Sequence, residues 1–277
     1  MDTSTDVDAD RALKDKHRAL WSLGNYPAVA TEVIPVTGRR LVEALDIHEG
    51  QRVLDVGAGS GNAAIPAALT GADVVASDLA PALLDVGRQQ ASEQGVTLEW
   101  READAEALPF DDAEFDVVMS CVGVMFAPHH QKSADELVRV CRPGGSIGLL
   151  SWTPEGFIGQ MFATMRPYAP PPPPGAQPPP LWGKEDHVRS LLGDRVTDVV
   201  AVKEVLMVDR FDSPENMRDF FKETYGPTIA VYRNIVDDPN RVKALDQELV
   251  NLAARHFDSG TETMGWEYLL LTATRQG

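Results

Sequence analysis

The sequence predicts an α/β fold with a doubly wound, mostly parallel sheet of seven strands. Between residues 51 and 152, short apolar runs alternate with helical patterns. These runs are continuous Val, Leu and Ile stretches, which are typical of parallel strands buried on both faces. After residue 152 come further helical patterns and two more strand-like segments. We therefore expect one sheet that begins near residue 51 and is completed near the C-terminus.

Each element is predicted from its own pattern. Apolar runs that end at glycine or aspartate indicate strands, and 3.6-residue periodicity indicates helices. The expected strands are 51–57, 72–78, 96–103, 115–122, 146–152, 196–211 and 266–274. The expected helices are 6–22, 27–47, 62–71, 81–95, 128–145, 157–167, 184–192, 213–223, 227–236 and 239–256. The helix over 128–145 is expected to stop at Pro143-Gly144-Gly145.

The pattern divides the chain into four parts. They are an N-terminal helical segment (1–48), a Rossmann-like core (49–210), a helical cap (211–260) and the last strand of the core (261–277). The core contains a loop, 168–183, in which eight of the eleven residues from Pro170 to Pro180 are proline. Proline runs are stiff and extended. We expect the loop to line an apolar substrate entrance; a passive surface loop and a ligand for a proline-reading partner are the alternatives.

Composition and charge restrict the class of protein. The net charge of −17 disfavours a nucleic-acid partner, because such a surface repels phosphate. No apolar run is long enough to span a bilayer, and the acidic N-terminus lacks a signal region, so we expect a cytoplasmic protein without membrane contact. Cys121 and Cys141 are expected to be small buried hydrophobes, and no metal site is expected. The first helix could pack on a second copy of the chain.

A glycine-rich turn follows the first strand in "DVGAGSGN". Such a turn lets backbone N–H groups approach a ligand at a helix N-terminus. It differs from the dinucleotide fingerprint, because Asn62 stands where the third glycine belongs and Gly61 comes one residue early. Asp78 ends the second strand, where a carboxylate can accept both hydroxyls of a ribose. Asp104 and Ala105 follow the third strand, where an adenine edge would lie.

These segments resemble the class I S-adenosylmethionine-dependent methyltransferases. "VLDVGAGSGN" and "DVVASDLAPALL" look like the first two motifs of that family. "EADAEALPFDDAEFDVVMS" and "ELVRVCRPGGSIGLLSW" look like segments of its small-molecule and quinone C-methyltransferase branch. The resemblance is strong over residues 20–152 and rests on element order alone beyond Trp152. It implies a seven-stranded sheet whose last strand is antiparallel.

The resemblance also implies roles for individual residues, with S-adenosyl-L-methionine as the cofactor. The turn residues Gly57, Ala58 and Gly59 would face its methionine part, while Asp55 would hold the turn in shape. Asp78 would bind the ribose and Leu79 would pack on the adenine. The remaining cofactor-binding candidates are Asp104 for the adenine amino group, Ala105 for a ring nitrogen, Ser120 and Cys121 near the amino group and sulfonium, and Tyr26 at the methionine end.

The acceptor side is less defined by the sequence. His129 and His130 are candidate bases, although "PHHQ" also reads as a helix start. Tyr225 is a third catalytic candidate, and for each of these, helix packing or solvent exposure is the alternative. The expected substrate-binding residues are aromatic or lie where the resemblance puts the acceptor: Trp21, Met125, Phe126, Tyr168, Trp182, Tyr232 and Arg233.

The chemistry predicted is methyl transfer to a carbon or oxygen atom of a small, apolar or aromatic metabolite. Such a displacement depends on holding the nucleophile and the methyl group in contact, and needs no metal. Other acceptors remain open, including a peptide, or a natural-product carboxylate or amine. An NAD-dependent oxidoreductase is disfavoured by Gly61 and Asn62. A non-catalytic S-adenosylmethionine-binding protein would carry the same motifs.

Overall fold

The computed structural model describes residues 3–277, with side chains from Asp10 onward, and contains one mixed sheet. The strand order is β3-β2-β1-β4-β5-β8-β6, and a short β7 pairs with β8. The first five strands are parallel to one another, while β8 is antiparallel to both β5 and β6. The strands are β1 (Arg52–Val56), β2 (Asp73–Asp78), β3 (Glu99–Glu102), β4 (Phe115–Cys121), β5 (Cys141–Trp152), β6 (Val196–Val208), β7 (Phe257–Asp258) and β8 (Thr263–Arg275).

The predicted α/β class and the antiparallel last long strand are confirmed. The direction in which successive strands are added to the sheet reverses between β1 and β4. The carboxyl ends of β1, β2 and β4 therefore lie side by side. Leu54 of β1 is in register with Val75 of β2 and with Val118 of β4. These three residues are fully buried. A crevice at such a reversal point is where ligands bind in open α/β sheets.

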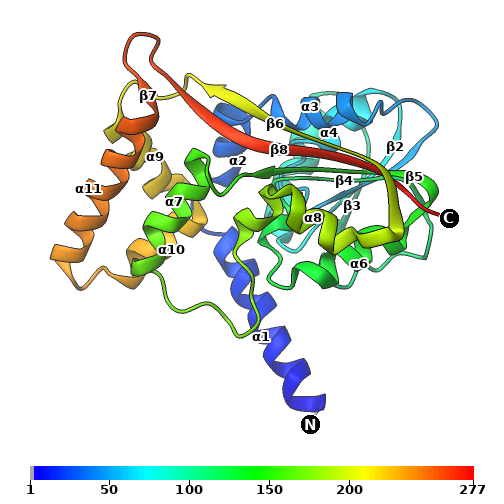
Figure 1. Ribbon diagram of the computed structural model, residues 1–277, viewed down its shortest axis with the longest axis horizontal. Coiled ribbons are helices and arrows are strands. Elements are labelled where there is room, and N and C mark those ends of the chain that lie inside the picture. Colours follow the sequence, from blue (N-terminus) through cyan, green and yellow to red (C-terminus); the bar gives the residue numbers. More distant parts are fainter. Residues whose placement is uncertain (1–2) are drawn as a thin grey trace.

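Helices cover the sheet and extend beyond one end of it. Figure 1 shows α3 and α4 on one side of the sheet, α6 and α8 on the other, and α7 and α9–α11 gathered at the end farthest from the C-terminus. The α-helices are α1 (Thr3–Trp21), α2 (Tyr26–Ala28), α3 (Thr37–Ala44), α4 (Ala64–Leu69), α5 (Pro81–Glu93), α6 (His130–Val140), α7 (Phe157–Met165), α8 (Glu185–Leu192), α9 (Pro214–Thr224), α10 (Gly226–Asn234) and α11 (Pro239–His256). Among residues 3–277, no helix combines the length and apolar character that crossing a bilayer demands.

Two predicted elements differ from the structure. The helix expected over 27–47 is broken into α2, a π-helical turn (Val29–Val33) and α3. Pro35 explains the break, because proline lacks an N–H and its ring disfavours helical geometry in the residue before it. The strand expected at 146–152 begins at Cys141, which pairs with Phe115. A register shift follows this pair, and the Pro-Gly-Gly segment lies within it, so that segment bends a strand. The helix before it ends already at Val140, short of the predicted stop at Pro143-Gly144-Gly145.

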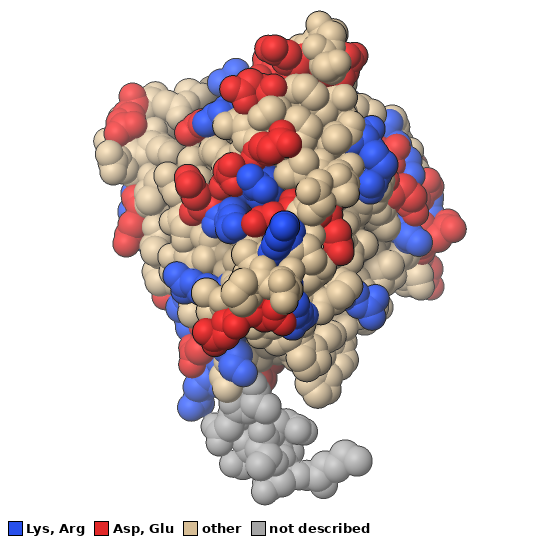
Figure 2. Space-filling model, turned by 90° about the vertical axis from the view of Figure 1, so that its left-hand side faces the viewer, with Lys and Arg blue, Asp and Glu red and all other residues tan. Residues whose placement is uncertain are grey.

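The helical end of the molecule is joined to the N-terminal segment. Asn25 donates its backbone N–H to the Thr224 carbonyl at 2.9 Å, and Gly24 forms an isolated bridge with Tyr225. Gly24 has a φ of +68°, and a Cβ there would lie 2.4 Å from the Thr224 oxygen, so a larger residue does not fit. Figure 2 shows that acidic and basic side chains are interspersed on the face at this end, without a continuous basic area.

Candidate functional site

A pocket lies where the carboxyl ends of the parallel strands meet, and we call it the strand-end pocket. It encloses about 640 Å³ of space that no atom fills, its open mouth included. Its lining residues are Lys14, His17, Trp21, Tyr26, Gly57, Gly59, Asp78, Leu79, Leu83, Ala103, Asp104, Ala105, Val122, Gly123, Phe126, Ala127 and Pro128. The structure thus brings together nine of the predicted site residues.

The floor of this pocket is bare backbone. Gly57 has a φ of +68°, and a Cβ there would lie 2.8 Å from the Gly123 Cα. A Cβ on Gly123 would in turn lie 2.2 Å from the Gly57 oxygen. The loops after β1 and β4 therefore touch through two glycines, which leaves their backbone accessible to a ligand.

Asp78 occupies the tip of β2 and faces this turn. One carboxylate oxygen accepts the Gly59 N–H and the other accepts the Ala80 N–H, both at 2.8 Å. Burial raises the pKa of Asp78, and these backbone donors act in the opposite direction. A carboxylate oxygen has more than one lone pair. Asp78 can therefore hold the glycine turn and still accept hydrogen bonds from a ligand in the pocket.

Asp55 lies beneath the turn and is 1% exposed. Neither of its carboxylate oxygens has a hydrogen-bond partner among the described residues. Burial, together with the charge of Asp78, raises its pKa to about 7, although the nearby Ala64 N–H, which does not reach hydrogen-bond geometry, acts in the opposite direction. Buried polar groups in native proteins are almost always paired. An unpaired carboxylate here is a group that a bound cation or hydrogen-bond donor would stabilise.

The N-terminal helix α1 contributes two basic side chains to the pocket rim. Lys14 is 7% exposed and lies 3.1 Å from Asp104 and 2.7 Å from Glu106. Arg18 donates from Nε to the Leu79 carbonyl at 3.1 Å. Asp104 also accepts the Glu106 N–H at 2.9 Å through the oxygen that faces Lys14. These contacts hold α1 across the predicted adenine end.

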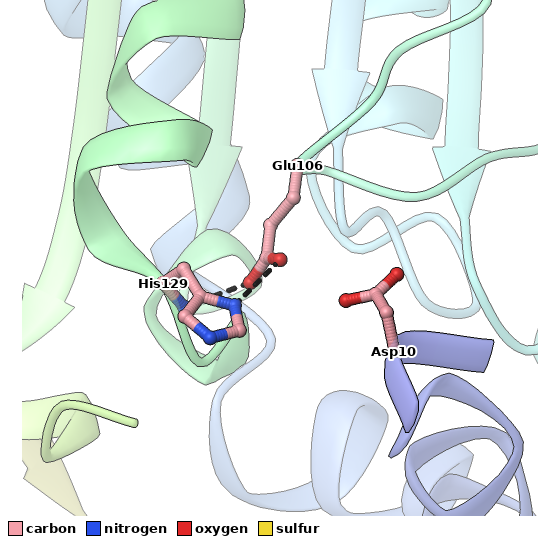
Figure 3. Close-up of side chains that lie close together, drawn as sticks. All are labelled: Asp10, Glu106 and His129. Carbon is pink, nitrogen blue, oxygen red and sulfur yellow. Dashed lines mark hydrogen bonds and ion pairs between the residues drawn. The ribbon is translucent and has the colours of Figure 1, made fainter. Parts of the chain in front are cut away.

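Figure 3 shows Asp10, Glu106 and His129 close together beside this rim. Their oxygen and nitrogen atoms lie within 4.8 Å of one another, which would allow a metal ion. However, Lys14 already brings a positive charge to within 2.7 Å of the same Glu106 oxygen that accepts from His129 Nδ1 at 2.9 Å. The group is therefore better described as an ion-pair network that fixes α1 and the segment after β4.

Ser120 and Cys121 end β4 and are buried below the pocket. Ser120 Oγ donates to the Val56 carbonyl at 2.6 Å and accepts the Val124 N–H at 2.8 Å. Burial raises the pKa of the Cys121 thiol to about 12, so it is protonated at neutral pH. Neither residue lines the strand-end pocket, and Ser120 instead ties the loop after β4 to β1.

A second pocket, which we call the aromatic pocket, adjoins the first. The two share Tyr26, Val122 and Phe126 in their linings. Trp21 contacts Tyr26 and Phe126 with ring centroids 5.4 and 4.7 Å apart, so aromatic rings surround the junction. The aromatic pocket is lined by Tyr26, Val29, Ile34, Val122, Phe126, Trp152, Ile158, Phe221, Tyr225 and Trp266.

The two histidines expected as bases lie outside both linings. His129 is held by Glu106. His130 is fully buried, and its Nδ1 lies 2.9 Å from His187 Nε2. Burial lowers the pKa of His130 to about 4, so its ring is neutral. Neither ring lines the strand-end pocket or the aromatic pocket, and a role for either histidine as a base stays a prediction.

Five of the expected substrate-binding residues also lie outside both linings, and most have structural contacts of their own. Tyr168 donates to Glu248 at 2.8 Å, which joins the start of the proline-rich loop to α11 of the cap. Tyr232 donates to Asp246 at 2.6 Å, which ties α10 to α11 within the cap. Trp182 packs on His130, with ring centroids 5.4 Å apart. Met125 is fully buried, and Arg233 is exposed.

The proline-rich loop covers the segment after β4. Its Gln177 N–H donates to the Pro128 carbonyl at 2.9 Å, and Gly175 faces the His129 ring. Pro179–Gly183 forms a short 3-10 helix. None of the loop residues 168–183 lines either pocket, and their place at a substrate entrance stays a prediction.

Comparisons with known proteins agree with this geometry. The family described as "Methyltransferase domain" matches residues 54–149. A protein of Mycobacterium tuberculosis, itself uncharacterised, is 51% identical over the full length of both chains. Demethylmenaquinone methyltransferase of Clavibacter sepedonicus is 42% identical over 137 residues, which cover 48% of this chain and 51% of that protein. This chain is a class I S-adenosylmethionine-dependent methyltransferase.

A solved structure supports the fold of this methyltransferase. A geranyl diphosphate methyltransferase in complex with S-adenosylmethionine aligns with a TM-score of 0.53 at 15% identity, covering 87% of this chain and 85% of the other. S-adenosylmethionine is the cofactor of the family. The strand-end pocket fits that cofactor, because it offers bare glycine backbone, a carboxylate at the tip of β2 and the unpaired Asp55 beneath the turn.

Sequence reasoning missed several lining residues of this methyltransferase. Lys14 and His17 come from α1, whose periodicity indicates a helix but not where it packs. Gly123 had a usable signal, since a glycine just after the fourth strand indicates a close backbone approach. Trp152 and Trp266 belong to β5 and β8 and meet with ring centroids 5.9 Å apart, although they are far apart in the sequence.

Proposed function

We propose that this methyltransferase transfers a methyl group to a carbon or oxygen atom of a small, apolar or aromatic metabolite. The observation that supports this most strongly is the aromatic pocket, which adjoins the strand-end pocket through Tyr26, Val122 and Phe126. An acceptor in the aromatic pocket would lie beside a methyl donor in the strand-end pocket. The relative named for demethylmenaquinone, which is an apolar quinone, supports an acceptor of this character.

In this proposal, residues of the strand-end pocket hold the cofactor. Asp78 would accept the ribose hydroxyls, and Leu79 would pack on the adenine. Asp104 would accept the adenine amino group through the oxygen that does not face Lys14. The backbone of Gly57 and Gly59 would lie against the methionine part, and the unpaired Asp55 beneath them would favour its positive charge.

The remaining contribution of the protein is positioning. When bound, the cofactor supplies an electrophilic methyl group on a sulfonium. Tyr26, Phe126 and Trp21 would exclude water from the junction and limit how the acceptor can approach. The segments that carry Tyr26 and Tyr225 are joined by the Gly24–Tyr225 bridge, so the N-terminal segment and the cap form this part of the site together.

Two measurements test the proposal. Calorimetry with S-adenosylhomocysteine should show binding to the wild type, and Asp78→Asn should weaken it by about 10- to 100-fold, since hydrogen bonds to a charged group are lost. Asp73→Asn is the matched control, because Asp73 begins the same strand and its side chain is 69% exposed.

Labelled S-adenosylmethionine should then methylate members of a panel of apolar ring compounds. Transfer to peptides or amines alone would contradict the acceptor class.

A further inference from the structure

The lining of the aromatic pocket is uncharged. Of the described residues that form it, none is Asp, Glu, Lys, Arg or His. Transfer of an unpaired charge from water into such surroundings is strongly unfavourable. A carboxylate, a phosphate or a protonated amine would find no counter-ion in this pocket. A protonated amine also lacks the electron pair that attacks the methyl carbon, and would face a positively charged sulfonium.

The polar groups in this lining are the indole N–H groups of Trp152 and Trp266, of which the Trp266 N–H has no partner among the described residues, and two tyrosine hydroxyls, which can also accept. Tyr26 and Tyr225 both line the pocket, with ring centroids 6.4 Å apart and ring planes inclined by 37°. The hydrogen bonds found among the described side chains involve neither hydroxyl, although Tyr225 is only 5% exposed. The other three tyrosines, Tyr168, Tyr232 and Tyr268, each donate to a glutamate or aspartate, whereas the partly buried Tyr26 and the buried Tyr225 do not. Unpaired hydroxyls inside a protein usually have a ligand or water as partner.

The hydroxyls of Tyr26 and Tyr225 are donors at neutral pH. Burial raises the pKa of Tyr225 well above its ordinary value, and burial together with the nearby Cys121, Asp78 and Asp55 raises that of Tyr26. Neither can therefore act as a base, but both can donate to an oxygen atom. Tyr26 also lines the strand-end pocket, so an oxygen held by it would lie close to the methyl donor.

We infer that the Tyr26 and Tyr225 hydroxyls form an oxyanion site, which binds the oxygen of a phenol, enol or similar acceptor beside the atom that is methylated. This inference rests on the proposed function. The acceptor binds in its neutral form and its O–H proton passes to bulk water through the open mouth of the strand-end pocket before the donor and acceptor are brought together. The two tyrosine donors stabilise the resulting negative charge. Its electron pair then forms the bond to the methyl carbon at the oxygen or at the conjugated carbon. The carbon–sulfur bond breaks and its electron pair stays on sulfur.

Preorganised donors of this kind are most effective where water is excluded and charge develops. Here the charge of the acceptor oxygen would lie near a positive sulfonium, and both charges disappear in the transfer. The site thus explains how an acceptor with an ionisable O–H group can react in a pocket whose described lining offers no carboxylate or histidine base.

The test uses 4-nitrophenol as a probe, because its phenolate absorbs at a different wavelength from the phenol. The probe is titrated with pH in the presence of saturating S-adenosylhomocysteine. We expect Tyr26→Phe and Tyr225→Phe each to raise the pKa of the bound probe by about one pH unit relative to the wild type, the size of one lost hydrogen bond to a charged oxygen. Tyr232→Phe is the matched control, since its hydroxyl donates to Asp246 within the cap.

The possible outcomes separate this inference from the proposed function. If the wild type binds no S-adenosylhomocysteine by calorimetry, the assignment of the cofactor pocket fails. If that ligand binds but the pKa of bound 4-nitrophenol is the same in both tyrosine variants and the wild type, the oxyanion site alone is refuted. Failure of the probe to bind, or binding of 4-nitrobenzoate as tightly as 4-nitrophenol, also overturns it. Thermal melts establish that the variants are folded. If one of the two tyrosine variants does not fold, the other alone is enough for the test.

Discussion

The two adjoining pockets are built in different ways. The floor of the strand-end pocket is made of backbone and short side chains at the ends of β1, β2 and β4, where the sheet order brings Gly57, Asp78 and Gly123 together, while α1 adds longer side chains at its rim. The aromatic pocket is made of large side chains from α2, α7, α9, β5 and β8. The first is therefore encoded in short motifs, and the second depends on how distant segments pack.

The largest effect on this difference is expected from a side chain added where the loops after β1 and β4 touch, at the floor of the strand-end pocket. Gly57→Ala places a methyl group 2.8 Å from Gly123 in a backbone of φ +68°. Because both loops must then shift, we expect the affinity for S-adenosylhomocysteine to fall at least 100-fold. Calorimetry on folded protein is the measurement.

Gly144→Ala is the control for that experiment. Gly144 has a similar φ of +74°, but no atom lies within 4 Å of the added methyl group. It carries the same type of backbone strain without the contact. Equal losses of affinity in Gly57→Ala and Gly144→Ala would show that strain, and not the close approach of the loops, is responsible.

The buried Asp55 predicts a pH dependence of stability for the ligand-free protein. Its pKa in the folded state is raised to about 7, whereas the unfolded chain ionises near 3.8. Between these values the folded protein retains a proton that the unfolded chain has lost, so stability falls as pH rises from about 4 to about 7. We expect this group to contribute a fall of roughly 2–4 kcal/mol.

Urea unfolding of the wild type and Asp55→Asn at pH 4.5 and 7.5 measures that contribution. The variant cannot ionise at this position, so its stability should decline less over the interval. Asp73→Asn, at the exposed start of β2, should keep the wild-type dependence. Parallel pH profiles for the wild type and Asp55→Asn would mean that Asp55 is paired in solution.

The smallest effect is expected from the loss of a hydrogen bond within the cap, outside the aromatic pocket. Tyr232 donates to Asp246 at 2.6 Å, and Tyr232→Phe removes this bond while keeping the ring. We expect a loss of about 1 kcal/mol in the free energy of unfolding and unchanged S-adenosylhomocysteine affinity. A large loss of cofactor affinity would show that the cap and the strand-end pocket are coupled more tightly than their separate linings indicate.

The same difference explains what the sequence could predict. The strands, the turn at Gly57 and the acid at Asp78 follow from local patterns, because parallel strands end at one edge. The aromatic pocket could not be found this way, since Trp152, Phe221 and Trp266 are typical core residues until the chain folds. Tyr168 and Tyr232 illustrate the converse: both were expected to bind the substrate, yet their hydroxyls bond to Glu248 and Asp246 of the cap.

The most direct test of the account is a crystal structure with S-adenosylhomocysteine bound. We predict that the ribose hydroxyls contact Asp78, that the amino acid part lies over Gly57 and Gly59, and that the sulfur faces Tyr26 at the junction of the two pockets. A complex in which the sulfur points away from Tyr26, or in which the ribose lies elsewhere than at the tip of β2, would contradict it.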